Sequence, residues 1–459
     1  MRRTLVLNVV GLTADLLRHA PNLSALAASG GQRPIGPVWP AVTCSVQSTY
    51  LTGLLPAAHG IVGNGWYFRD LSEVWLWRQS NRLVAGEKVW ETARKRNPAF
   101  TCAQLFWWYN MYSSADFSVT PRPCYPADGR KIPDIYTQPT ELRTELNERL
   151  GPFPLFRFWG PATDLSSSRW IADCALQVSR SRRPTLSLVY LPHLDYDLQR
   201  LGPEHPAIPK AVAEVDALCG ELLAHAREEG MAVIVLSEYG IGPVAGSVAI
   251  NRILRQAGWL ALREELGREL LDPGASSAFA VADHQIAHVY VREAERVGEV
   301  ARLLRAQPGI ERILAGAEKA NAGLDHPHAG ELVAVAAADR WFSYGWWLDE
   351  AHAPDYARTV DIHRKPGYDP VELFLDQRLR WPKLAIALRL GLRKLGFRAL
   401  MDVISLDENL VRGSHGRPPD DPARGPLLIS SEPDLLPKDM IIPATSVKAF
   451  MLAHVFGTR

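Results

Sequence analysis

Residues 40–64 read PAVTCSVQSTYLTGLLPAAHGIVGN, and the interpretation of the whole chain starts from this stretch. Thr43 stands at the head of a helix-like run, and a glycine-containing turn further along ends at Asn64. A hydroxyl at the start of a helix lies beside backbone N–H groups that lack partners within the helix, which suits a phosphate group. The same position equally suits an ordinary N-cap. The local pattern therefore leaves two interpretations of Thr43 open, a site residue and a helix cap.

Apolar runs rich in β-branched residues alternate with helical patterns around this stretch. The runs at 4–10, 185–194 and 231–237 predict buried strands, and 207–229 predicts a helix. Continuous apolar strands separated by helices are typical of a parallel sheet that is covered on both faces. Ligands of such sheets bind at the carboxyl ends of the strands. We therefore expect the site in the loops that follow the three runs.

Polar side chains follow two of these runs. The second run leads into His193, Asp195 and Asp197, which share one face if the strand continues that far. The third run leads into Glu238 and Tyr239. Aspartate, glutamate and histidine gathered from separate strand ends can form a metal site. Later loops add three histidines that can enter the same region: His284, His363 and His415.

The order of these pieces resembles the type I phosphodiesterase/nucleotide pyrophosphatase family of the alkaline phosphatase superfamily. The most specific segment is 40–64, with its Pro-x-x-Thr, Thr-Gly and His-Gly-Ile-x-x-Asn pattern, and LDYDLQRLGP, VIVLSEYG and GSHG follow in the family order. The resemblance implies an α/β fold, an alkaline-phosphatase-like three-layer sandwich with a mostly parallel central sheet. We expect one domain, 1–459, with its core at about 1–240 and 330–459.

A small α+β cap is expected between the two parts of this core, at about 245–330. Within it, residues 288–314 read as strand, helix, strand. The run GELVAVA at 330–336 is expected to resume the main sheet.

The resemblance also implies a reaction, the hydrolysis of a phosphate ester or pyrophosphate. In the family a threonine attacks phosphorus to form a phosphothreonine, which water then hydrolyses, and two zinc ions hold the attacking and leaving oxygens. Thr43 matches the nucleophile. Asn64 matches the asparagine that donates a hydrogen bond to a phosphoryl oxygen.

The first metal position of the family has lost most of its ligands in this sequence. Val10 stands where the family has an aspartate at the end of the first strand, and valine cannot bind a metal. Glu238 and Tyr239 replace an Asp-His pair. Thr43 and Glu238 alone are too few protein ligands for a closed tetrahedral zinc site.

The second metal position keeps more of its ligands. Asp195 and His415 match, whereas Gln199 stands in place of a histidine. A single hard cation such as Mg²⁺ or Mn²⁺ can bind such a set with water completing its shell. We therefore expect a reduced divalent-metal site, holding zinc or a single Mg²⁺ or Mn²⁺, from four residues: Asp195, Glu238, His415 and Gln199.

Other side chains can compensate for lost metal. Arg364 and Lys365 can supply fixed positive charge to a phosphate. Four further residues are candidates for lining the pocket: His193, Tyr239, His284 and His363. An alternative remains open, in which the chain is a catalytically inactive pseudoenzyme that binds a phosphate-containing ligand or a partner protein.

Composition limits the partners. The 51 basic and 50 acidic residues are nearly balanced, which argues against a binder of nucleic-acid polymers and leaves a small phosphate-containing substrate as the expected partner. The five scattered cysteines fit a reducing compartment, so we expect a cytoplasmic protein. Residues 378–398 carry seven basic residues and no acidic one, and 383–398 reads as a basic amphipathic helix, suited to a membrane surface or a protein partner.

Overall fold

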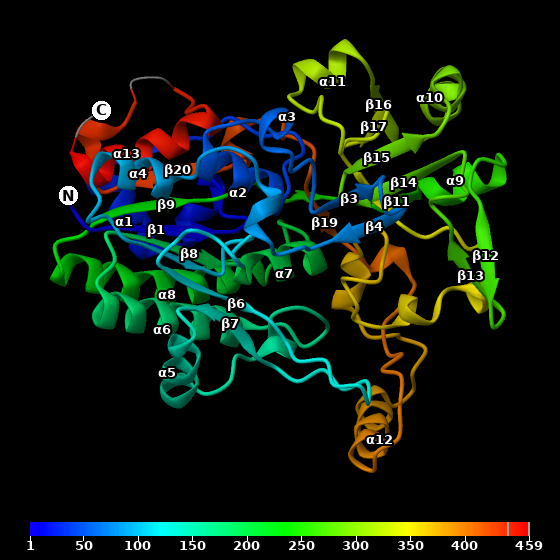
Figure 1. The fold of residues 1–459 in the computed structure, drawn as a ribbon, viewed down its shortest axis with the longest axis horizontal. Helices are drawn as coiled ribbons and strands as arrows, with labels where there is room; N and C mark the ends of the chain where they lie inside the picture. Colours follow the sequence, from blue (N-terminus) through cyan, green and yellow to red (C-terminus); the bar gives the residue numbers. More distant parts are fainter. Residues whose placement is uncertain (438–439, 458–459) are drawn as a thin grey trace.

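The central element is a sheet of eight strands in the order β2-β20-β9-β1-β8-β5-β6-β7, in a computed structural model that describes residues 1–437 and 440–457 (Figure 1). Strands β9, β1, β8, β5 and β6 run parallel, whereas β2, β20 and β7 pair antiparallel. The α/β class with a mostly parallel sheet is therefore confirmed. The bounds are β1 (Thr4–Val9), β2 (Gln32–Pro34), β5 (Cys102–Leu105), β6 (Phe117–Pro121), β7 (Ile135–Gln138), β8 (Leu186–Leu191), β9 (Ala232–Leu236) and β20 (Leu427–Ser430).

Helices cover both faces of this sheet (Figure 1). One layer contains α1 (Pro21–Ser29), α6 (Leu165–Arg182) and α8 (Ile208–Glu228), and the other contains α2 (Thr43–Thr52), α4 (Val89–Arg96) and α13 (Val447–Phe456). Every residue of β1, β8 and β9 is buried, because apolar side chains meet a helix layer on each side. The predicted helix at 207–229 is confirmed as α8.

The carboxyl ends of β9, β1 and β8 lie at one edge of the sheet. In the strand register Val9 pairs with Leu191 and Asn8 pairs with Leu236, so the three strands end nearly level. The segments that follow them, which include Val10, Asp195 and Glu238, therefore meet at this edge, as expected for a parallel sheet.

A second, four-stranded sheet in the order β14-β15-β17-β16 stands beside the first (Figure 1). Its strands are β14 (Ala278–Asp283), β15 (Ile286–Val291), β16 (Ile310–Leu314) and β17 (Leu332–Ala336), with α10 (Val297–Arg305) between β15 and β16. The strand, helix, strand pattern expected within 288–314 is confirmed. The expectation that residues 330–336 resume the main sheet is wrong, because β17 pairs with β15 and β16.

Helix α12 (Pro382–Lys394) stands away from both sheets, at the end of an arm at the bottom of Figure 1. It is the helical part of the segment 383–398, and none of its residues is buried. Within the described residues, no helix combines the length and the apolar character needed to cross a membrane.

Candidate active site

Thr43 is the first residue of α2, and the residue before it, Val42, occupies the N-cap position. Valine has no side-chain oxygen, so the N-cap residue itself gives the first turn of α2 no side-chain hydrogen bond. The Thr43 hydroxyl instead lies 3.0 Å from the phenol oxygen of Tyr239, and both residues line the same cavity. The interpretation of Thr43 as a helix cap is therefore wrong, and its hydroxyl is left for contacts outside its own helix.

Asn64 lies against the first turn of α2. Its side-chain oxygen accepts a hydrogen bond from the backbone N–H of Cys44 at 3.0 Å. Its side-chain nitrogen donates to one carboxylate oxygen of Asp283 at 3.0 Å, and its backbone N–H donates to the other at 2.7 Å. Asn64 thus fixes the start of the helix next to Thr43. Its predicted role as a donor to a phosphoryl oxygen stays a prediction.

Asp195 lies in the first turn of α7 (His193–Leu201) and lines the cavity. Its carboxylate accepts hydrogen bonds from the Gln199 side-chain nitrogen at 2.8 Å and from the Tyr239 phenol at 3.4 Å. Burial disfavours the charged form and raises the pKa of Asp195 to about 7. Asp195 can therefore take up or release a proton near neutral pH.

The expected alignment of His193, Asp195 and Asp197 on one strand face is wrong, because these residues belong to a helix rather than to a strand. Asp195 alone of the three lines the cavity. The His193 ring instead faces the Glu214 carboxylate, 3.3 Å away, and Asp197 pairs with Arg200.

Glu238 is held by two amide side chains that the sequence did not single out. The side-chain nitrogens of Asn8 and Gln47 each donate to the same carboxylate oxygen at 2.6 Å, while the other carboxylate oxygen has no partner among the described residues. Burial raises the pKa of Glu238 to about 8, so its neutral form is favoured at neutral pH. Asn8 is visible in the sequence only as a polar break in the apolar run TLVLNVV.

Four aromatic rings stack across the site. The rings of Tyr239 and His415 lie 3.6 Å apart, those of His415 and His284 lie 3.6 Å apart, and those of His284 and Tyr368 lie 3.7 Å apart. The His415 Nδ1–H donates to the carbonyl oxygen of Ala41 at 2.8 Å. Burial lowers the pKa of both histidines well below its usual value, so both are neutral at pH 7.

Asp283 and His284 form a carboxylate–imidazole pair. The His284 Nδ1–H donates to an Asp283 oxygen at 2.8 Å, which leaves the His284 Nε2 lone pair without a partner among the described residues. Burial raises the pKa of Asp283 to about 6, still below neutral pH. The sequence placed His284 in VADHQIAH but did not identify Asp283, the residue directly before it.

These residues do not fit the family's metal centre. Val10 is fully buried and apolar. The Gln199 side chain is engaged at both ends, since its nitrogen donates to Asp195 and its oxygen accepts from the Tyr368 phenol at 2.9 Å. The Tyr239 ring is stacked on His415. Within the part of the chain that the structure describes, no group of three or more His, Cys, Asp or Glu has the arrangement needed to hold a metal ion.

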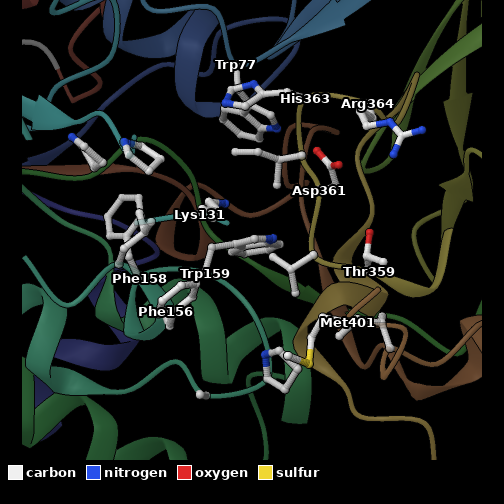
Figure 2. A pocket seen from close by; sticks show the side chains of 18 of the residues that line it. Trp77, Lys131, Phe156, Phe158, Trp159, Thr359, Asp361, His363, Arg364 and Met401 are labelled. Atoms are coloured by element: carbon white, nitrogen blue, oxygen red, sulfur yellow. The ribbon is translucent and has the colours of Figure 1, made fainter. Parts of the chain in front are cut away.

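A cavity of about 890 Å³ joins this edge of the sheet to α12. Figure 2 shows part of it, where the rings of Phe158 and Trp159 lie near Lys131, while the Arg364 guanidinium points away. Arg364 pairs with Asp355 at 3.2 Å, and Lys365 is buried outside the cavity lining. The lining includes five of the residues proposed from the sequence for the site or its pocket, namely Thr43, Asp195, Tyr239, His284 and His363. It also includes three residues of α12, Ile386, Leu390 and Arg393.

The comparisons with known proteins agree with this architecture. The family model for "Type I phosphodiesterase / nucleotide pyrophosphatase" matches residues 4–369. An uncharacterized pyrophosphatase/phosphodiesterase of Schizosaccharomyces pombe is 26% identical over 254 residues, which is 52% of this chain. The match spans 45% of that relative's own length.

Solved structures resemble the fold over nearly the whole chain. Murine ectonucleotide pyrophosphatase/phosphodiesterase 5, as an inactive variant in complex with AMP, has a TM-score of 0.58 at 13% identity, covering 100% of this chain and 96% of its own. Phosphonoacetate hydrolase from Sinorhizobium meliloti 1021, in complex with phosphonoformate, has a TM-score of 0.60 at 13% identity, covering 99% and 96%. At these identities the likeness concerns the fold.

Proposed function

We propose that this chain, which belongs to the type I phosphodiesterase/nucleotide pyrophosphatase family, hydrolyses a phosphodiester or pyrophosphate bond with Thr43 as the nucleophile. Hydrolases of this family typically depend on divalent metal ions. In the proposed reaction, side chains of this chain take the place of the two-metal centre. The observation that carries this proposal is the chain of contacts from the Thr43 hydroxyl through the Tyr239 phenol to the Asp195 carboxylate. Asp195 is the member of this chain that titrates near neutral pH.

The direction of these hydrogen bonds supports proton transfer away from Thr43. An ionised Asp195 can only accept, so the single hydroxyl proton of Tyr239 points toward it. The Thr43 hydroxyl must then be the donor in its contact with Tyr239. When the Thr43 oxygen attacks phosphorus, its proton moves to Tyr239 as the Tyr239 proton moves to Asp195, and the bond from phosphorus to the leaving group breaks.

The start of α2 provides positive potential where the metals of the family would supply charge. The first backbone N–H groups of a helix have no partners within it, and the helix dipole places a partial positive charge there. Val42 gives no side-chain cap, and the Cys44 N–H is bonded to the Asn64 side-chain oxygen, so the other N–H groups of the first turn are the ones that can receive a phosphoryl oxygen beside Thr43. A phosphoryl oxygen bound there is stabilised by hydrogen bonds, which favours attack by Thr43.

The second step is the hydrolysis of the phosphothreonine. The free lone pair of the His284 Nε2 accepts a proton from water, whose oxygen attacks phosphorus as the bond to Thr43 breaks, and the Asp283 carboxylate stabilises the imidazolium that burial otherwise disfavours. Asp195 then returns its proton to Thr43 through Tyr239. His284 releases the proton taken from water, which balances the charge of the departed leaving group, and Asp283 holds the imidazole in the required tautomer.

The test is the hydrolysis of bis(p-nitrophenyl) phosphate with and without a chelator, followed from pH 5.5 to 8.5. The base Asp195 works when ionised, so we expect kcat/KM to rise about tenfold between pH 6 and 8 and to be unchanged by EDTA. Asp195→Asn should remove both the activity and the pH dependence. The matched control is Asp197→Asn, a change on the same helix outside the cavity lining, which should keep both.

Loss of activity in EDTA and its return with Zn²⁺ would contradict the metal-independent mechanism. The single Mg²⁺ or Mn²⁺ expected from Asp195, Gln199 and His415 is not part of the proposal, because Gln199 is already engaged at both ends. The predicted cytoplasmic location stays a prediction, as does the small phosphate-containing substrate in preference to a nucleic-acid polymer.

A second candidate is ligand binding without turnover. It is favoured by Glu238, whose carboxylate oxygen is already bonded to the amides of Asn8 and Gln47 and whose neutral form is favoured. A protein that binds a non-hydrolysable phosphonate diester in calorimetry, yet shows no hydrolysis above that of the Asp195→Asn variant, would establish this alternative.

A further inference from the structure

The cavity reaches far beyond Thr43. It begins at the residues that follow the central strands and extends to α12, which stands at the end of the arm in Figure 1. Its volume of about 890 Å³ lies near the upper end of the range for small-molecule sites, roughly 300–1,000 Å³. A phosphate group bound at Thr43 occupies a small part of such a space. The remainder must accommodate the group to which the phosphate is attached.

The lining of the remainder is mostly apolar, with a few charged side chains such as Arg122 and Asp361. Aromatic rings such as Trp77, Phe158 and Trp159 surround its middle, and Leu390 and Met401 stand at the α12 end. Apolar lining of this kind favours burial of hydrocarbon over the hydrogen-bonding edges of a nucleobase. We propose that the ligand is an amphiphile, a phosphate ester whose long hydrocarbon group extends from Thr43 toward α12.

Lys131 supplies a cation within this apolar lining (Figure 2). Lys131 has no ion-pair partner within 4.0 Å among the described residues, although the Asp361 carboxylate, which lines the same cavity, favours its charged form. A cationic side chain in an aromatic cavity attracts an anionic group. The cavity therefore combines a hydrocarbon-binding surface with a positive charge, which is the combination that an anionic amphiphile requires.

This inference rests on the proposed function for the position of the phosphate group, and it is tested separately by binding. Dodecyl phosphate, kept below its micelle concentration, and butyl phosphate are titrated into the Thr43→Ala variant, with the tryptophan fluorescence of the cavity as the readout. We expect dodecyl phosphate to bind at least about tenfold more tightly than butyl phosphate, because its longer chain buries more apolar surface. Lys131→Met should weaken binding of both.

Leu390→Glu places a charge in the cavity lining and should abolish the preference for the longer chain. Leu388→Glu is its matched control on the same helix, since Leu388 is exposed and does not line the cavity. Equal affinity for the two alkyl phosphates, or tighter binding of AMP than of dodecyl phosphate, would overturn the amphiphile proposal. Neither result depends on turnover, so the hydrolysis proposal would still be decided by its own assay.

The outer face of α12 carries a second inference independently. Residues 384, 388, 392 and 395 are leucines that repeat at helical spacing and are 45% to 75% exposed. They lie on the side of the helix opposite Ile386, Leu390 and Arg393, which line the cavity. The helix therefore has two apolar faces, one toward the cavity and one unpartnered among the described residues.

Positive charge flanks this outer face. Arg380, Lys383 and Lys394 form no ion pair with any described residue, and 378–398 contains no acidic residue. Exposed leucines bordered by basic residues match the requirements of an anionic bilayer, where the leucines enter the acyl region and the basic groups contact lipid phosphates. We infer that α12 docks on an anionic membrane surface.

Co-sedimentation with vesicles tests this docking. The full chain should bind vesicles of phosphatidylcholine with 30% phosphatidylserine and bind pure phosphatidylcholine at least about fivefold less. The double variant Leu388→Glu/Leu395→Glu should lose the binding. Leu266→Glu should keep it, because Leu266 is even more exposed but lies away from α12, in the turn between β12 (Leu262–Glu265) and β13 (Arg268–Leu271).

Equal binding to both kinds of vesicle, or an equal loss in Leu266→Glu, would overturn the docking proposal. A third outcome would also overturn it: the chain is a dimer in size-exclusion chromatography, the double variant is a monomer, and neither binds vesicles. In that case a second copy of the chain would cover the leucines.

Discussion

Replacing Thr43 with alanine is expected to reduce the hydrolysis of bis(p-nitrophenyl) phosphate by about 10³-fold or more, while the chain stays folded. The Thr43 hydroxyl is the atom that forms the covalent bond to phosphorus in the proposed reaction, so no other group replaces it. Its removal costs one buried hydrogen bond, to Tyr239, which is small against the stability of a chain of this size. Initial rates and thermal unfolding curves of the same preparation measure the two effects.

Two variants sharpen this experiment. Thr43→Ser keeps a hydroxyl at the same position and should retain a measurable part of the rate. Thr52→Ala removes a buried hydroxyl from the same helix, one that donates to the carbonyl oxygen of Ser48, and should leave kcat unchanged. Full activity of Thr43→Ala in a preparation free of contaminating phosphatase would disprove the nucleophile assignment.

Replacing Lys365 with methionine is expected to lower the free energy of unfolding by about 3–5 kcal/mol, the range found when one partner of a buried ion pair is removed. The Lys365 ammonium lies 2.7 Å from Asp369 and 2.7 Å from Glu372, and its side chain is 1% exposed. Methionine would leave the two carboxylates buried without their cation. Urea denaturation measures the change, and Lys383→Met, on exposed α12, is the control with little expected effect.

The same substitution distinguishes two roles of Lys365: the structural role, in an ion pair with Asp369 and Glu372, and the role suggested by the sequence, which is to supply positive charge to a phosphate. A phosphate-binding lysine would, when replaced, weaken ligand affinity and leave stability intact. An unchanged unfolding midpoint together with a raised KM would therefore contradict the structural role. Glu372 also accepts a hydrogen bond from the Trp159 indole at 2.6 Å, so some loosening of the cavity is expected alongside the loss of stability.

The sequence predicted the main sheet because its strands have a simple signature. Runs that are apolar at every position must be buried on both faces, and the strands β1, β8 and β9 meet that condition. The start of α7 was missed because LPHL extends the apolar run of β8 by a few residues. Leu194, Leu198 and Leu201 show the helical spacing that decides the case.

The pairing of β17 could not be predicted from its own residues. Its sequence LVAVA is apolar at each position, which indicates a buried strand but does not identify its neighbours. Its pairing depends on β15 and β16, and such long-range contacts leave no local pattern.

Some residues of the candidate site were predicted from the sequence, and others were not. Thr43, Asp195 and His415 were found through the family order of the segments that contain them. Asn8 and Gln47 were not, because an amide that neutralises a buried carboxylate looks in sequence like any polar residue in a buried strand or helix. Hydrogen bonds also engage both ends of the Gln199 side chain, which a comparison of ligand positions alone does not reveal.

The four stacked rings have a mechanical consequence. Tyr239 follows the central strand β9, whereas His284 stands between β14 and β15 of the second sheet, so the stack ties the two sheets together. A hinge that separated the sheets would have to break this stack and the bonds from Asn64 to Asp283. The part of the cavity boundary that this stack does not hold is the arm that carries α12, whose residues Ile386, Leu390 and Arg393 line the cavity.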